Sequence, residues 1–217
     1  MWPNGFLNIT SRGRRSEPQV YLTFDDGPDP RFTPAILDTL AQHQIKASFF
    51  VLGEACAAHP ALVRQAAQAG HDIGIHSYSH AHPWRLPETE AREEMRRCYH
   101  TLADITGSPP RLFRPAYGRI RPATLQQASA LQLRTVLWSR SVIDWGTWGT
   151  LSGVSRRLAA VRPGDIVLMH DARPDANRPQ VTQTALQNFL LTDKAASLNF
   201  CGLSQLLEKT GERHARS

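Results

Sequence analysis

Short apolar stretches and longer amphipathic stretches alternate along the chain from about residue 18 onward. A run of apolar residues bounded by turn residues is typical of a strand that is buried on both faces of a sheet. Such runs occupy residues 20–24, 47–52, 71–75, 112–113, 134–138 and 165–169. Each of them is predicted to be a strand.

Three of the intervening stretches have the periodicity of helices. Residues 33–43 and 61–69 are predicted helices, and the second ends before Gly70. The clearest helix has an apolar stripe with spacings of four, three, four and three residues, formed by Ala91, Met95, Cys98, Leu102 and Ile105. This spacing places the stripe on one helix face, so we interpret it as a core contact.

Alternation of strands and helices is the pattern of an α/β domain with a mostly parallel sheet. Six or seven strand–helix units in 217 residues suit a shortened barrel better than an open sheet. We therefore predict a distorted (β/α) barrel with about seven parallel strands. The predicted organisation is a loose N-terminal arm over residues 1–17, one domain over 18–210, and a C-terminal tail over 211–217.

Composition adds that the chain is globular and basic. Hydrophobic residues make up 41% and charged residues 20%, which excludes an intrinsically disordered chain. The formal net charge is +6, but the arginine runs are short and lack interleaved aromatic residues, which argues against a nucleic-acid partner. Cys56, Cys98 and Cys201 are widely spaced and odd in number. Buried free thiols are therefore expected rather than disulfides.

Nothing in the sequence predicts a membrane segment. No apolar run is long enough for a signal peptide or a transmembrane helix. The expected location is therefore cytoplasmic, either free or peripheral to the membrane. The sequence gives no basis for predicting an oligomeric state.

Polar clusters follow the predicted strands. In parallel α/β folds the carboxyl ends of the strands meet at one edge, where reacting groups are assembled. Any one of these clusters alone is an ordinary polar loop, whereas five at one edge indicate a site. They are Asp25 with Asp26, His76 with His80, Arg114, Asp144 with Trp145, and His170 with Asp171.

The first two clusters have the composition of a metal site. Two adjacent carboxylates repel each other unless a cation or a shared proton lies between them. His76 and His80 are four residues apart, and two imidazoles with one carboxylate form a facial triad that leaves open positions on a metal. Surface or structural roles are assigned to His43, His59, His71, His82 and His100. Of these, His82 is a rival ligand because it lies close to His80 in sequence.

Taken together and in order, the motifs resemble those of the polysaccharide deacetylases, the NodB-homology proteins of carbohydrate esterase family 4. The resemblance covers nearly the whole chain, from about residue 20 to residue 207. The matching segments are residues 22–28 (LTFDDGP), 76–80 (HSYSH), 114–118 (RPAYG), 144–145 (DW) and 168–171 (LMHD).

The resemblance implies a distorted (β/α) barrel that removes acetyl groups from an N-acetylated amino sugar, usually an N-acetylglucosamine unit of a glycan, oligosaccharide or glycolipid. It implies one divalent metal ion, commonly zinc. The ligands carried over by motif are Asp26, His76 and His80. The backbone N–H of Tyr117 is expected to bind the oxyanion.

The resemblance also implies roles for the remaining motif residues. Asp25 is expected to be the general base, with Arg114 orienting and tuning it. His170 is expected to be the general acid. Trp145 and Leu168 are expected to form the wall of the pocket for the acetyl methyl group.

Two positions depart from the family pattern. Ala116 stands where a second proline is common, which should slightly loosen its loop. Ser141 stands where the family often has an acid that pairs with the arginine corresponding to Arg114. Either another carboxylate, Asp144 or Asp165, takes over that pairing, or the tuning of the base changes.

Three rival interpretations stay open, and the sequence gives little evidence on one of them, the deacylation of a substrate that is not a glycan. Two histidines and a carboxylate also bind Fe(II) in oxygenases, although such enzymes need no second aspartate beside the ligand and no opposed histidine. A non-catalytic carbohydrate-binding relative would keep the fold, and Ser141 is the only feature that favours it. Catalysis is the leading hypothesis because the expected base and acid, Asp25 and His170, are both present. The scarcity of long loops favours a small or lipid-linked amino sugar over a polymer.

Overall fold

A parallel sheet forms the centre of the molecule. The computed structural model describes residues 9–214, with side chains as far as residue 208. In the described residues the strand order is β1-β6-β5-β4-β3-β2-β8-β7, with β9 beside β2, and the ladders between these strands are parallel. The strands are β1 (Ile9–Thr10), β2 (Gln19–Asp25), β3 (Ser48–Val51), β4 (Asp72–Ile75), β5 (Leu112–Phe113), β6 (Arg134–Val136), β7 (Arg140–Ser141), β8 (Ile166–His170) and β9 (Asn199–Phe200).

The sheet curls into a half-barrel. β6 and β7 are consecutive along the chain, yet β6 lies beside β1 at one end of the sheet and β7 lies at the other end. No ladder joins these two ends among the described residues, so the barrel is open there. The distorted (β/α) barrel predicted from the sequence is therefore confirmed.

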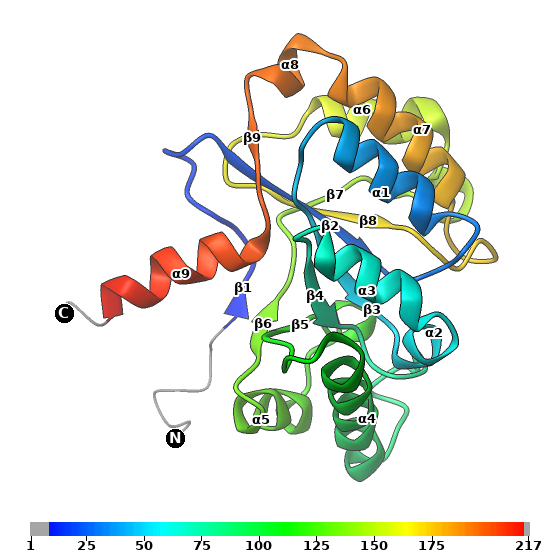
Figure 1. Cartoon of the computed structure of the whole chain (residues 1–217), viewed down its shortest axis with the longest axis vertical. Helices are drawn as coiled ribbons and strands as arrows, with labels where there is room; N and C mark the ends of the chain where they lie inside the picture. The colour runs from blue at the N-terminus through cyan, green and yellow to red at the C-terminus, as the bar shows by residue number, and fades with distance from the viewer. Residues whose placement is uncertain (1–8, 215–217) are drawn as a thin grey trace.

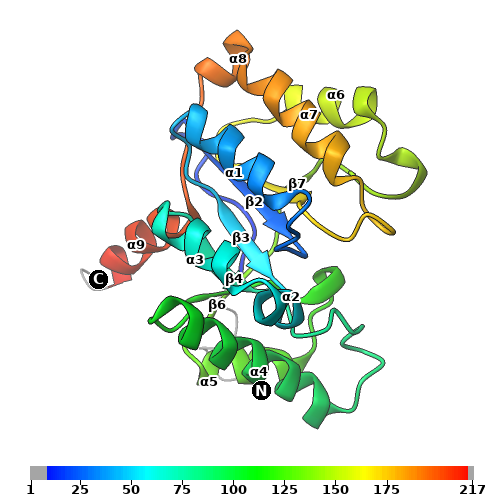
Figure 2. The ribbon, with the colours of Figure 1, turned by 45° about the vertical axis from the view of Figure 1, so that its right-hand side comes forward.

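Helices cover the outside of the curled sheet. In Figures 1 and 2, α1, α6 and α7 lie on one side of the molecule, and α4 and α5 lie on the opposite side. Within these groups α6 packs against α7, and α4 packs against α5. The helices are α1 (Thr33–Gln42), α2 (Gly53–Ala58), α3 (Pro60–Gln68), α4 (Glu88–Thr106), α5 (Pro122–Ala130), α6 (Leu151–Ala159), α7 (Pro179–Leu190), α8 (Asp193–Ala196) and α9 (Leu203–His214), with 3₁₀ turns η1 (Ala116–Gly118) and η2 (Gly146–Trp148).

The core lies between the sheet and these helices. β2 is buried at every position after Gln19, as a strand covered on both faces should be. The predicted stripe on α4 is buried at its first four positions, and Ile105 is partly buried against the core. Full burial of a side chain such as Leu102 stabilises the fold by about 1.5–3 kcal/mol. The three cysteines are buried thiols that form no disulfide, as expected.

The N-terminal segment is attached to the sheet where the structure describes it. Residues 1–8 of the expected loose arm lie outside the described residues. Residues 9–17 are not loose, because β1 pairs with the edge strand β6 and the N–H of Gly13 donates to the carbonyl of Gly164 at 2.8 Å. An edge strand leaves backbone groups to be paired, which explains this attachment. At the other end, α9 continues past residue 210 to His214, and residues 215–217 lie outside the described residues.

The described helices do not include a candidate membrane span. From residue 9 to residue 214, none of them is both long and apolar enough to cross a bilayer. The cytoplasmic location stays a prediction.

Candidate active site

A cleft of about 440 Å³ lies at the edge where the strands end. β2 ends at Asp25 and β8 ends at His170, and these two residues are partners in the ladder between the strands. Of the nine site residues predicted from the sequence, Arg114 is fully buried just after β5. The other eight line the cleft: Asp25, Asp26, His76, His80, Tyr117, Trp145, Leu168 and His170. The strand ends thus bring together residues that are far apart in sequence.

Asp26, His76 and His80 surround a point suited to a cation. Each offers one ligand atom, and the three atoms lie within 4.8 Å of one another. Oδ1 of Asp26 is 3.1 Å from Nε2 of His80 and 3.5 Å from Nε2 of His76. This oxygen is buried and receives no hydrogen bond within the described chain. One carboxylate oxygen and two imidazole nitrogens converging in this way fit a divalent cation with mixed ligands.

The imidazole of His76 is held in the form that a metal requires. Its Nδ1 lies 2.9 Å from the carbonyl oxygen of Arg114. A carbonyl only accepts, so Nδ1 carries the proton and Nε2 keeps its lone pair toward Asp26. Burial lowers the pKa of His76, against the raising effect of Asp25 and Asp26. A neutral imidazole with a free Nε2 is the ligand form.

The second oxygen of the Asp26 carboxylate is fixed by the loop after β8. Nδ2 of the buried Asn177 donates to Oδ2 of Asp26 at 2.8 Å, and Nη1 of Arg173 lies 3.7 Å from the same oxygen. Burial by itself raises the pKa of Asp26, but the imidazoles of His80, His76 and His170 outweigh it and hold the pKa below its ordinary value. Asp26 is therefore an ionised carboxylate with Oδ1 left for a cation.

Arg114 holds the neighbouring carboxylate. Its Nη1 donates to Oδ1 of Asp25 at 2.6 Å and to the hydroxyl of Thr23 at 2.8 Å. The other nitrogens face the backbone carbonyls of residues 136 and 137, and the guanidinium carbon lies 4.1 Å from the ring centroid of Phe50. Burial lowers the pKa of Arg114, against the raising effect of Asp25. Arg114 thus fixes one oxygen of Asp25 and leaves the other on the side of His76, 3.6 Å away.

Among the described residues, no second carboxylate pairs with Arg114 in place of the acid that is missing at Ser141. Of the two alternatives left open, the one in which Asp144 or Asp165 pairs with Arg114 is wrong, because Asp144 binds His170 and Asp165 binds Arg140. The hydroxyl of Ser141 instead accepts the backbone N–H of residue 143 at 3.0 Å. In the described part of the chain, Asp25 is the one carboxylate that forms an ion pair with Arg114.

His170 also lines the cleft and is paired with Asp144. Nδ1 of His170 donates to Oδ1 of Asp144 at 2.8 Å. Oδ2 of Asp144 accepts the backbone N–H of His170 at 2.7 Å and the hydroxyl of Thr182 at 2.6 Å. Burial by itself lowers the pKa of His170, but the carboxylates of Asp144, Asp26 and Asp25 raise it to about 9. The raised pKa favours the protonated ring, the state that a proton donor needs.

Left-handed backbone concentrates at this edge of the sheet. Non-glycine residues with positive φ include Asp26, Ser77, His80, Tyr117 and Arg173. Such conformations cost energy and persist where the surrounding structure holds them, most often at functional sites. Two of the three candidate ligands, Asp26 and His80, thus have a left-handed backbone.

Aromatic and aliphatic side chains form one wall of the cleft. Trp145, Leu168 and Trp138 line it, and the ring of Trp145 meets that of His170 edge-on at 5.5 Å. The ring of Tyr117 is half exposed and lies 4.4 Å from that of His80. Trp138 was not predicted as a site residue because it reads as the end of a strand.

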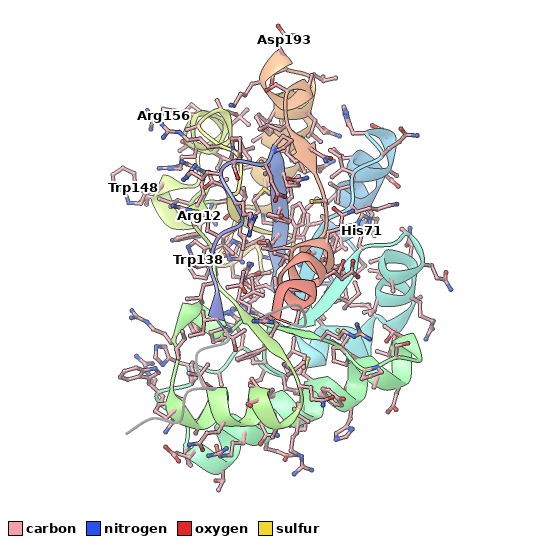
Figure 3. All side chains as sticks on the ribbon, turned by 90° about the vertical axis from the view of Figure 1, so that its left-hand side faces the viewer. Arg12, His71, Trp138, Trp148, Arg156 and Asp193 are labelled. Atoms are coloured by element: carbon pink, nitrogen blue, oxygen red, sulfur yellow. The ribbon has the colours of Figure 1, made fainter. Side chains whose placement is uncertain are left out.

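Two of the histidines predicted to have surface or structural roles, His71 and His82, lie outside the candidate metal site. His82 lines the cleft but lies outside the group of candidate ligands. His71 is buried, and its Nδ1 accepts the N–H of Ala47 at 3.1 Å. Figure 3 shows His71 on the opposite side of the molecule from Trp138 and Trp148.

Sequence reasoning missed two residues that contact the candidate ligands. Arg173 and Asn177 lie in the loop between β8 and α7, a stretch without periodicity. The one available signal was proximity in sequence to His170. Asp171 was grouped with His170, but it is absent from the cleft lining and accepts a hydrogen bond from the hydroxyl of Thr33 at 2.6 Å. Burial raises the pKa of Asp171 to about 7.

Comparison with known proteins agrees with this geometry. The sequence profile described as polysaccharide deacetylase matches residues 12–136. The chain belongs to this family. A peptidoglycan-N-acetylglucosamine deacetylase of Bacillus cereus is 34% identical over 201 residues, which cover 93% of this chain and 72% of that protein. A chitooligosaccharide deacetylase of Bradyrhizobium sp. (strain ANU 289) is 37% identical over 164 residues, 75% of each chain.

Solved structures of relatives share the deacetylase fold. The Bc1960 peptidoglycan N-acetylglucosamine deacetylase, bound to an N-hydroxybenzamide compound, superposes with a TM-score of 0.84 at 33% identity, covering 92% of both chains. BA3943 from Bacillus anthracis, a pseudoenzyme of carbohydrate esterase family 4, superposes with a TM-score of 0.80 at 25% identity, covering 92% of this chain and 68% of the other. Because one such relative is a pseudoenzyme, activity has to be argued from the site residues.

Proposed function

We propose that this polysaccharide deacetylase hydrolyses the acetamide of an N-acetylglucosamine-type sugar, releasing acetate and the free amine. The named relatives act on peptidoglycan and on chitooligosaccharides, both N-acetylated sugars. The observation that carries the proposal is that one cleft brings together a candidate cation site at Asp26, a second carboxylate at Asp25, and His170, whose pKa the surrounding carboxylates raise.

Asp26, His76 and His80 would hold one divalent metal ion, for which we propose zinc because zinc commonly binds two imidazoles and a carboxylate at catalytic sites. When bound, such an ion lowers the pKa of its water and polarises the substrate carbonyl. Asp25 would accept the proton of the attacking water. Arg114 holds Asp25 through Oδ1, so the second oxygen is the one left for this task.

His170 would donate the proton that the leaving amine needs. Asp144 holds its Nδ1, which leaves Nε2 as the donor to substrate. The backbone N–H of Tyr117 would stabilise the oxyanion of the tetrahedral intermediate. Trp145 and Leu168 would bound the space for the acetyl methyl group, and an apolar wall that fits a methyl limits the acyl chain to a small one.

The rival interpretations explain less of the cleft. A facial-triad Fe(II) enzyme would need neither the Arg114–Asp25 pair nor the His170–Asp144 pair. A binding-only relative gives no reason for raising the pKa of His170 to about 9 beside a cation site. Hydrolysis uses each of these groups.

Product analysis by mass spectrometry tests the proposal. The metal-loaded chain would be incubated with N-acetylated sugars and oligomers, beside a metal-stripped sample of the same preparation. The expected result is the loss of acetyl groups from at least one sugar in the loaded sample and none in the stripped one. Intact sugars throughout the panel, with full metal loading, would favour the binding-only interpretation.

A further inference from the structure

Arg173 is a cation at the cleft that the proposed hydrolysis does not use. It lies in the loop after β8, lines the cleft, and has a side chain that is 38% exposed. Its backbone is left-handed, with φ of 56°. A non-glycine residue in this conformation is strained, so the loop holds Arg173 at the cleft at a cost in free energy.

The charged side chains that line the cleft do not balance once a dication is bound. Among the described residues that line it, the carboxylates are Asp25 and Asp26. Both are engaged in the centre, the first by Arg114 and the second by Asn177 and the cation site. Arg119 and Arg173 are the lining arginines. With a dication at the centre, positive charges outnumber the two carboxylates, and the cleft attracts anions.

The guanidinium of Arg173 has N–H donors that no described residue accepts. Its Nη1 faces Nδ1 of His80 and lies 3.7 Å from Oδ2 of Asp26. In the described part of the chain, its Nε and Nη2 have no hydrogen-bond acceptor. A ligating Nε2 would require Nδ1 of His80 to carry the proton, and two donors cannot pair. A metal bound through Nε2 of His80 therefore frees Nη1 as well.

We propose that Arg173 binds an anionic group of the substrate, a carboxylate or a phosphate attached near the acetamido sugar. The planar fork of a guanidinium matches two oxygens of either group, and such charge-assisted pairs are strong. The substrate class is then an anionic N-acetylated sugar rather than a neutral oligosaccharide. This inference rests on the proposed function, because it concerns the substrate of the same cleft.

Kinetics on three matched substrates test the inference. They are a neutral N-acetylglucosamine disaccharide, the same disaccharide with a lactyl ether carboxylate on the neighbouring sugar, and the same disaccharide with a phosphate at its reducing end. The metal-loaded wild type is compared with Arg173→Ala and Arg173→Lys. Arg64→Ala is the matched control, because it removes an exposed arginine of α3 that does not line the cleft. Metal content and dissociation constants for the three sugars are measured in each protein.

In the wild type, kcat/KM should be higher for at least one anionic substrate than for the neutral one. The ratio of kcat/KM for the anionic substrate to kcat/KM for the neutral one should fall about tenfold or more in Arg173→Ala, because the substitution removes a hydrogen bond to a charged group. Arg173→Lys should recover part of it, and Arg64→Ala should leave it unchanged. The substrate that shows the effect identifies the group that Arg173 binds, the carboxylate or the phosphate.

An equal ratio in wild type and Arg173→Ala, at equal metal content, would overturn the inference and leave the deacetylase function standing. If no substrate is hydrolysed, the proposed function fails, and the ratio of dissociation constants for the anionic and neutral sugars decides the inference by itself.

Discussion

Replacing Asp144 with asparagine should lower the pKa of His170. The fall in activity at alkaline pH should then begin at a lower pH. Asp144 is fully buried and binds the ring of His170 through Oδ1. Asparagine has nearly the same size, and its carbonyl oxygen can still accept from Thr182 and the backbone N–H of His170. Its amide nitrogen then faces Nδ1 of His170. The substitution therefore removes one negative charge beside the imidazole with little loss of packing.

The size of the effect follows from the shift in the wild type. The carboxylates around His170 overcome burial and raise its pKa from 6.5 to about 9. At about 1.4 kcal/mol per pH unit, this difference is worth about 3 kcal/mol in favour of the protonated ring. Loss of an adjacent opposite charge shifts a pKa by about 1–3 units, so the variant should return toward the ordinary value. A bound dication lowers the pKa in both proteins, so they are compared at equal metal loading.

The same pKa sets a stability window. His170 has a higher pKa in the folded chain than in the unfolded chain. Its contribution is therefore fully present below pH 6.5 and is lost as the pH rises through about 9. The free energy of unfolding, measured in urea, should differ most between wild type and Asp144→Asn below pH 6.5. The difference should narrow toward pH 9.

Two measurements check the prediction for His170. The alkaline limb of kcat/KM against pH should move to lower pH in Asp144→Asn, and the ring resonances of His170 should titrate with the same shift in NMR spectra. Thr182→Val is the control, because it removes a neutral donor to Asp144 and keeps the charge. An alkaline limb that stays in place in folded, metal-loaded Asp144→Asn would refute His170 as the proton donor.

Three further predictions concern the cation site and the base. His76→Ala and His80→Ala should each lose the bound metal, while His82→Ala should keep it; elemental analysis with full metal in the first two would remove them as ligands. Asp25→Asn should keep the metal and lose about 10²–10⁴-fold in kcat, so near-normal turnover at confirmed loading would exclude Asp25 as the base. Asn177→Ala should weaken metal affinity about 10–100-fold by freeing the second oxygen of the ligand carboxylate, and an unchanged affinity in a chelator competition would show that this contact is structural only.

The fold was predictable from the sequence where one segment carries its own pattern. The apolar strands and the stripe on α4 are local signals, and the structure contains them with small shifts at their ends. β1, β7 and β9 have two residues each and, unlike the equally short β5, each contains a polar residue, so no apolar run marks them. The pairing of β1 with β6 depends on a tertiary contact at the sheet edge, which no local pattern encodes.

The site was predictable as a set of residues but not as a set of pairs. Motifs at strand ends placed eight residues around one cleft because parallel strands share an edge. Which carboxylate holds which base depends on side-chain directions across the barrel. The resemblance predicted that Arg114 acts on Asp25 but left open whether Asp144 or Asp165 also pairs with it. Among the described residues, Asp25 is the carboxylate that pairs with Arg114. Asn177 contacts Asp26 from 151 positions away, with no motif to connect them.

The most direct test of metal-dependent deacetylation is acetate release measured while metal is returned to the metal-free chain. Zinc would be added in steps to the stripped protein with an N-acetylglucosamine oligosaccharide present, and bound metal and released acetate would be measured together. We predict that acetate release rises with bound zinc and saturates at one ion per chain. Release by the stripped chain, or no release from any N-acetylated sugar at full occupancy, would contradict it.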